Sequence, residues 1–372
     1  RDTSVTGVQT CALPIFILTG KHSHINGKID NIAKFDDSQM TFPQLFKKNG
    51  YQTAMFGKLH FGNNPKGIDD FLILPGQGDY INPRFLGKEK DTIITGYVTD
   101  VITDLTLDWF KNKRDKDKPF LTFYLHKAPH RAWWPSPEKF AEFYNKKFPE
   151  PETLFDDYSN RGTAAKTAEM NLLTHMQYMQ DSKVRPSVFE KMENVEPKIL
   201  YARGDGTFFE PSSNSFNNRY NRANDEQKKK YDVTLDKISK DFEANWPNMT
   251  NKEKMQWKFQ RYMQDYLATI SSVDDNVGRV LDYLEETGLD KNTIVVYTSD
   301  QGFYLGEHGW FDKRFIYDES FKTPLLIKWP NQIKPGTTNE EMVQNLDFAQ
   351  TLDRKSTRLN SSHRCISYAV FC

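Results

Sequence analysis

The stretch from Asn292 to Pro330 constrains the fold of this chain more than any other. Residues 292–297 read NTIVVY, an apolar and β-branched run that is typical of a buried strand, and residues 323–330 form a second short run bounded by proline. Between them, residues 298–320 (TSDQGFYLGEHGWFDKRFIYDES) crowd charged and aromatic side chains together. Ligands of open α/β sheets bind just beyond the carboxyl ends of the strands. The stretch therefore predicts a functional site attached to a buried strand.

The rest of the chain shows alternating strand and helix patterns. Runs with strand or helix periodicity recur at residues 41–50, 51–56, 71–74, 98–110, 120–125 and 259–284. This alternation predicts an α/β fold with a mostly parallel sheet and helices on both faces. Residues 136–254 are more polar, and we interpret them as a helical and loop insertion over the sheet rather than a second domain with its own core.

Composition excludes some classes of protein. Lys+Arg and Asp+Glu are equal at 50 each, so charge gives no reason to expect a nucleic-acid partner. Apolar residues at 37% and aromatic residues at 14% are typical of a globular chain. No stretch has the length and hydrophobicity of a membrane span.

Two pairs of polar residues follow predicted strands. Asp300 and Gln301 supply the hard oxygen ligands that Ca²⁺ and Mg²⁺ prefer, although a capped turn is the commoner role for such residues taken alone. Lys58 and His60 stand beyond the strand at 51–56 and can point to the same side. Taken alone, this pair is more often a surface lysine and a half-buried histidine. The residues by themselves leave both interpretations open.

Four segments, taken together and in this order, resemble the sulfatases, a branch of the alkaline-phosphatase-like superfamily. They are LTGKHSHING at 18–27, the run at 41–62 that ends in GKLHFG, HKAPHRAW at 126–133, and the SDQG and GEHG motifs within 298–320. The resemblance implies an alkaline-phosphatase-like sheet that lacks its first strand and its C-terminal subdomain here.

The resemblance also implies roles for the polar residues. Lys58 and Lys313 would bind the sulfate group, and Asp300 and Gln301 would be ligands of one Ca²⁺ ion. His130 would protonate the leaving alcohol, which a sugar needs because its alkoxide is a poor leaving group.

Further roles follow from the same resemblance. His60 would hydrogen-bond the nucleophile or a sulfate oxygen, and His308 and Arg314 would contact the substrate. In the family, a Cys or Ser before the Leu-x-Thr-Gly segment becomes formylglycine, whose hydrate attacks sulfur. Cys11 lies near that position, but its register and neighbours do not fit. We therefore expect formylglycine in the parent protein, no nucleophile in this chain, an incomplete Ca²⁺ site, and no sulfatase activity of the chain as written.

The two ends of the chain carry a shared signal. Residues 5–15 can be back-translated into a DNA sequence. The reverse complement of that DNA encodes residues 353–363 without a mismatch. Such a match is typical of a sequencing adapter read through on both sides of a fragment, so we predict that 1–15 and 353–372 are adapter-derived and that 16–352 is a truncated catalytic domain. All three cysteines lie in these ends and give no signal of compartment. We also expect both ends to stay out of the sheet.

The sequence thus predicts a hydrolase of glycan sulfate monoesters, most similar to sulfatases of the N-acetylglucosamine-6-sulfatase type. One alternative is a phosphodiesterase or phosphomonoesterase of the same superfamily. Those sites usually hold two metals and often have His where Gln301 stands. Another is a non-catalytic protein that binds sulfated glycans. The family resemblance implies a periplasmic, secreted or lysosomal location, and the oligomeric state stays open.

Overall fold

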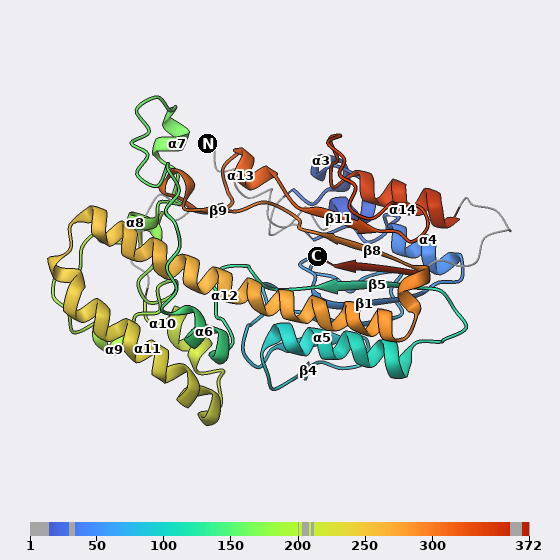
Figure 1. The fold of residues 1–372 in the computed structure, drawn as a ribbon, viewed down its shortest axis with the longest axis horizontal. Coiled ribbons are helices and arrows are strands. Elements are labelled where there is room, and N and C mark those ends of the chain that lie inside the picture. The colour runs from blue at the N-terminus through green and yellow to red at the C-terminus, as the bar shows by residue number, and fades with distance from the viewer. Residues whose placement is uncertain are drawn as a thin grey trace.

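The fold was analysed in a computed structural model, which describes residues 15–29, 34–199, 201–202, 208–209, 212–357 and 367–371. A mixed sheet crosses the molecule, and helices lie above and below it (Figure 1). Cys11 and the other residues before 15 lie outside the described residues. Within the described part of the chain, no helix is long and apolar enough to cross a membrane.

The described strands form an eight-stranded sheet in the order β11-β8-β12-β5-β1-β2-β3-β4. Their bounds are β1 Gln52–Lys58, β2 Asp70–Leu74, β3 Arg84–Gly87, β4 Thr92–Ile93, β5 Phe120–Leu125, β8 Thr293–Thr298, β11 Leu325–Lys328 and β12 Ser367–Phe371. Strands β8, β12, β5, β1 and β2 are parallel, and the strands toward both edges are antiparallel. The predicted mostly parallel sheet is therefore confirmed, and its parallel strands all end at one edge.

Helices cover both faces of this sheet. The main helices and helical turns are α3 Ser23–Asn26, α4 Phe42–Lys48, α5 Val98–Asp108, the π-helical η1 Trp109–Lys113, α12 Asn251–Glu286, the 3-10 turns η3 Leu289–Asn292 and η4 Glu307–Gly309, α13 Asp318–Phe321 and α14 Asp347–Thr357. Helices α5 and α12 lie on one face, and α4 and α14 lie on the other (Figure 1). The prediction of helices on both faces is confirmed.

The central strands are apolar on both sides because each side faces a helical layer. In β1, Ala54 and Phe56 belong to the core under α5 and α12, whereas Met55 between them belongs to the opposite core. Tyr124 and Phe123 of β5 divide in the same way. This two-sided burial is the physical cause of the continuous apolar runs in the sequence.

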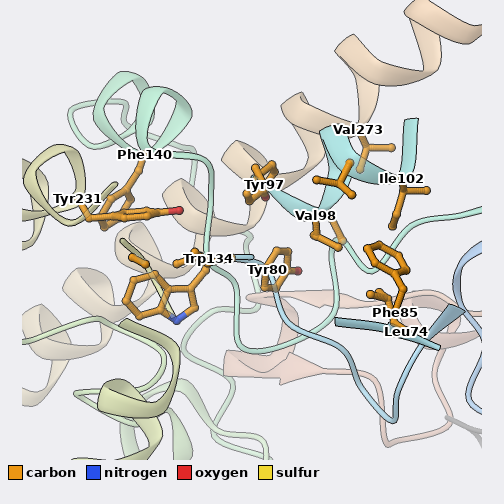
Figure 2. Packing of buried hydrophobic residues seen from close by; sticks show 14 of the residues in the cluster. Leu74, Tyr80, Phe85, Tyr97, Val98, Ile102, Trp134, Phe140, Tyr231 and Val273 are labelled. Carbon is orange, nitrogen blue, oxygen red and sulfur yellow. The ribbon is translucent and has the colours of Figure 1, made fainter. Parts of the chain in front are cut away.

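The insertion after β5 packs onto the same core. Its elements are α6 Pro137–Phe143, α7 Thr163–Lys166, α8 Leu172–His175, α9 Pro186–Phe189, β6 Tyr201–Ala202, β7 Phe208–Phe209, α10 Asn214–Tyr220, α11 Asp225–Asn245 and η2 Trp246–Asn248. Figure 2 shows Trp134, Phe140 and Tyr231 at one end of the cluster that also contains Ile102 and Val273. The side chains of the insertion thus extend the core of the sheet.

Helix α12 begins earlier than its periodicity indicated. Thr250 caps it: the Thr250 hydroxyl accepts a hydrogen bond from the Glu253 N–H (3.3 Å), and Glu253 accepts one from the Thr250 N–H (2.8 Å). The helix therefore runs unbroken from Asn251, through the expected end of the insertion at 254.

The expectation that both ends stay out of the sheet is wrong for the C-terminal end. Strand β12 lies between β5 and β8 and pairs with both, with Ala369 opposite Thr122 and Val295. Ile15 is fully buried in the core on the α4 side. The physical reason is that β5 and β8 present facing rows of backbone donors and acceptors, which a short strand satisfies. The adapter origin of the two ends stays a prediction.

Candidate active site

A cavity of about 390 Å³ lies where the parallel strands end. It is lined by residues that follow β1, β5 and β8, segments that are far apart in the sequence. The predicted catalytic and metal-binding residues all line it: Lys58, His60, His130, Asp300, Gln301 and Lys313. The predicted convergence of these side chains is confirmed, because the parallel sheet brings the strand ends together.

The position of Lys58 depends on a glycine before it. Gly57 has φ +113°, a conformation that side-chain-bearing residues rarely adopt. A Cβ atom at this position would lie 1.7 Å from the backbone oxygen of Leu125. Gly57 therefore lets β1 and β5 approach closely at their ends, so that Lys58 and His60 share a cavity with the segment that follows β5.

Backbone contacts fix the loop after β8. The Ser299 hydroxyl donates to the Gln301 carbonyl (2.9 Å), and the Asn345 amide donates to the Asp300 carbonyl (2.9 Å). A Cβ on Gly302 would lie 2.1 Å from the Glu319 carbonyl oxygen, so only glycine fits there. These contacts hold the two predicted metal ligands at the strand end.

A short hairpin returns the chain to the cavity. Strand β10, Phe311–Asp312, pairs with β9, Tyr304–Leu305, in antiparallel fashion. Lys313 follows directly and is only 7% exposed, with its ammonium nitrogen 5.6 Å from the Phe303 ring centre. The hairpin thus explains how a residue so far beyond the strand reaches the cavity.

The hydrogen bond of His130 defines its tautomer. Its Nδ1 lies 2.5 Å from the Arg131 carbonyl oxygen, which can only accept, so Nδ1 carries the proton and donates. The Tyr80 hydroxyl donates to the His130 carbonyl (2.8 Å) and fixes the backbone. In the neutral ring, Nε2 is left as the atom that can take up or deliver a proton.

Burial and the nearby lysines lower the pKa of two histidines of the cavity. Burial, reinforced by the positive charges of Lys58 and Lys28, lowers the pKa of His60 to about 4. Burial also lowers the pKa of His130 well below its usual value, and the nearby charges of Lys313, Lys58 and Lys127 add to this effect. The cavity is therefore positively charged and holds neutral imidazoles, which suits an anionic ligand.

Asp300 and Gln301 match the donor chemistry of Ca²⁺. Both side chains line the cavity, and no described residue forms a hydrogen bond or salt bridge with the Asp300 carboxylate. Ca²⁺ takes about six to eight oxygen ligands, and the described residues contain no cluster of three or more His, Cys, Asp or Glu side chains able to hold a metal. The two residues fit Ca²⁺ as part of a ligand set.

The structure does not bring His308 and Arg314 to this cavity. The His308 ring lies in an aromatic cluster beside the cavity, with Nδ1 3.0 Å from the Asp156 carboxylate and Nε2 3.6 Å from Glu319, which lines the cavity. The Arg314 side chain is 54% exposed and donates to Asp312 (2.9 Å). Their substrate contacts stay untested predictions without support from this geometry.

Sequence reasoning missed Lys127 and Gln77 near the site, and it interpreted His126, which also lines the cavity, as structural. His126 and Lys127 line the cavity, and the Lys127 ammonium donates to the Gln77 carbonyl (2.9 Å). The Gln77 side-chain amide lies 3.3 Å from His60 Nδ1. All three lie inside segments that the sequence had singled out, but nothing in the sequence separates such residues from neighbouring loop positions.

Comparison with known proteins identifies the family. The family model described as Sulfatase matches residues 1–353. The chain therefore belongs to the sulfatase family, which agrees with the resemblance of its motifs and with its fold.

Individual relatives narrow the comparison. The chain is 43% identical over 338 residues to the N-acetylglucosamine-6-O-sulfatase of Bacteroides thetaiotaomicron, which covers 90% of this chain and 57% of that protein. It is 23% identical to the human N-acetylglucosamine-6-sulfatase, over 94% of this chain and 53% of that protein. The chain thus spans little more than half the length of these two sulfatases.

A solved structure is also similar. It is described as a complex with its substrate D-glucosamine-2-N,6-O-disulfate. The superposition gives a TM-score of 0.85 at 40% sequence identity and covers 98% of this chain and 70% of that one. The alkaline-phosphatase-like fold is confirmed.

Proposed function

We propose that this chain forms the catalytic core of a glycan sulfatase that hydrolyses 6-O-sulfate esters of N-acetylglucosamine. The observation that carries this proposal is the convergence of Lys58, Lys313 and His130 with Asp300 and Gln301 in one cavity. The relatives named above support the substrate, since two of them are N-acetylglucosamine-6-sulfatases by name. We further propose a periplasmic, secreted or lysosomal location.

Lys58 and Lys313 bind the sulfate group in this proposal. Cleavage of the S–O bond moves negative charge onto oxygen atoms, and fixed cations in a partly enclosed cavity stabilise that charge. Asp300 and Gln301 would hold part of the Ca²⁺ site, and Ca²⁺ when bound polarises the sulfate oxygens. The expected formylglycine of the parent protein supplies the nucleophile.

His130 delivers a proton to the leaving sugar oxygen. Burial, together with the charges of three lysines, holds the pKa of His130 low in the free site. A bound sulfate ester brings negative charge that opposes the lysines, so the pKa of His130 rises on binding. The proton then leaves from Nε2, because Nδ1 is held by the Arg131 carbonyl.

The test is to assay this chain, and the full-length gene product that contains it, in a host that makes formylglycine. We expect the gene product to release sulfate from 6-sulfated N-acetylglucosamine, and the chain as written to release none. Faster hydrolysis of p-nitrophenyl phosphate would favour the phosphatase alternative. Binding of the sulfated sugar without hydrolysis of either ester would favour the non-catalytic alternative.

A further inference from the structure

A second cavity of about 120 Å³ lies beside the candidate active site. Its lining includes Gln77, Asp79, Lys127, Arg131, Arg219 and Arg222. We call it the arginine cavity. A cavity of roughly 150 Å³ can hold benzene, so this one has room for a single sulfate or carboxylate group but not for another sugar ring.

The arginine cavity adjoins the active-site cavity through Lys127, which lines both. The positive charges of Lys58 and Lys313 on one side, and of Arg219 on the other, add to the burial that lowers the pKa of Lys127. Gln77 of the arginine cavity also contacts His60 of the active site. One glycan can therefore reach both cavities with two of its substituents.

Positive charge exceeds negative charge in the arginine cavity. Asp181 is engaged by Arg131, with Nε–Oδ1 at 2.8 Å, and Asp79 lies 3.1 Å from Arg222. Arg219 has no such partner: no carboxylate of the described residues lies within salt-bridge distance, and its guanidinium donates to the Ser215 carbonyl (2.5 Å).

Burial makes this charge costly without an anion. Burial lowers the pKa of the Arg219 guanidinium; the charges of Asp181 and Asp79 oppose that effect in part, and the charge of Arg131 adds to it. An anion in the cavity would offset this cost, because its oxygen would pair with the guanidinium.

We infer that the arginine cavity is a subsite for a second anionic group of the glycan, bound while the 6-O-sulfate occupies the active-site cavity. This inference rests on the proposed function and makes its substrate a glycan with at least two anionic groups. The shared chemistry of the ligand is a sulfate or carboxylate group that pairs with the Arg219 guanidinium. Its source is either an N-sulfate on the same sugar or the carboxylate of a neighbouring uronic acid.

The experiment compares three substrates of the full-length gene product. They are 6-sulfated N-acetylglucosamine, N,6-disulfated glucosamine, and 6-sulfated N-acetylglucosamine linked to a uronic acid. The readout is kcat/KM, or the calorimetric Kd where a substrate is not turned over. We expect Arg219→Ala to lower kcat/KM, or to raise Kd, about 10-fold or more for one or both dianionic substrates, because a charge-assisted hydrogen bond is lost. The same values for the monoanionic substrate should not change.

Two further variants keep the result interpretable. Arg219→Lys should restore part of the dianion preference because it keeps the charge. Arg185→Ala is the matched control, because Arg185 pairs with Asp232 and Asp236 outside the cavity. This substitution should change kcat/KM or Kd equally for all three substrates. Selective loss on the N-sulfated or on the uronate substrate identifies the source of the anion.

Equal losses on all three substrates in Arg219→Ala would overturn the subsite. Failure of the wild-type protein to hydrolyse any sulfate ester would instead contradict the proposed function. The Kd values then test the subsite separately, and equal affinities of the wild-type protein for the mono- and dianionic ligands would overturn it.

Discussion

His126 makes the free energy of unfolding depend on pH. Both of its ring nitrogens are buried without a hydrogen-bond partner, and burial lowers the pKa of His126 to about 3. The unfolded chain, in which a histidine has a pKa of about 6.5, therefore binds more protons between these two values. Stability from this residue is complete above pH 6.5 and is lost as the pH falls toward 3.

The corresponding prediction concerns His126→Asn. Between pH 7 and pH 4.5 the wild-type protein should lose on the order of 2 kcal/mol more stability than the variant. Urea unfolding of both proteins at several pH values measures this difference. Parallel pH profiles for the two proteins would show that His126 is not buried as a neutral ring.

His130 should matter in proportion to the difficulty of the leaving group. A sugar alkoxide needs a proton as it leaves, whereas a phenol, with a pKa of about 10, leaves more easily without one. We expect His130→Asn to reduce kcat on 6-sulfated N-acetylglucosamine by about 10²- to 10⁴-fold, and to reduce it far less on an aryl sulfate. Equal losses on both substrates would mean that His130 positions the substrate and does not deliver the proton.

At the scale of elements, a buried ion cluster ties α12 to the insertion. The Asp265 carboxylate contacts Lys183 (2.6 Å) and Arg261 (2.6 Å), and all three side chains are 4% exposed or less. Removal of the carboxylate leaves two buried cations without their partner. Asp265→Ala should therefore destabilise the protein by about 3–5 kcal/mol.

The matched control lies on the same helix. The Asp275 side chain is 56% exposed and pairs with Lys139 at 2.8 Å, so Asp275→Ala should cost about 1 kcal/mol or less. Denaturant midpoints of both variants provide the comparison. Similar values for the two would contradict the anchoring of α12 by the buried cluster.

The elements that were predicted well share a physical cause. Strand β5 and the core of β1 are buried on both faces, so their runs are continuously apolar and can be read without a structure. The start of α12 was placed too late because its first turns are polar, and only the Thr250 cap marks them. Lys127 was missed because its role depends on two cavities that form only in the folded chain.

For the whole molecule, the sequence predicts which strand ends converge but not every strand that separates them. The motifs after β1, β5 and β8 indicated one site, and the parallel sheet brings them to one edge. The pairing of β12 between β5 and β8 could not be foreseen, because strand pairing depends on which edges are open in the folded sheet and not on local pattern.

The most direct measurement is sulfate release from 6-sulfated N-acetylglucosamine by the full-length gene product and two neighbouring variants. Lys313 lines the active-site cavity, whereas Arg314 is exposed outside it. Lys313→Ala should lose about 10²- to 10³-fold in kcat, and Arg314→Ala should stay within about 3-fold of wild type. No sulfate release by the wild-type protein, or equal losses in the two variants, would contradict a sulfatase site in this cavity.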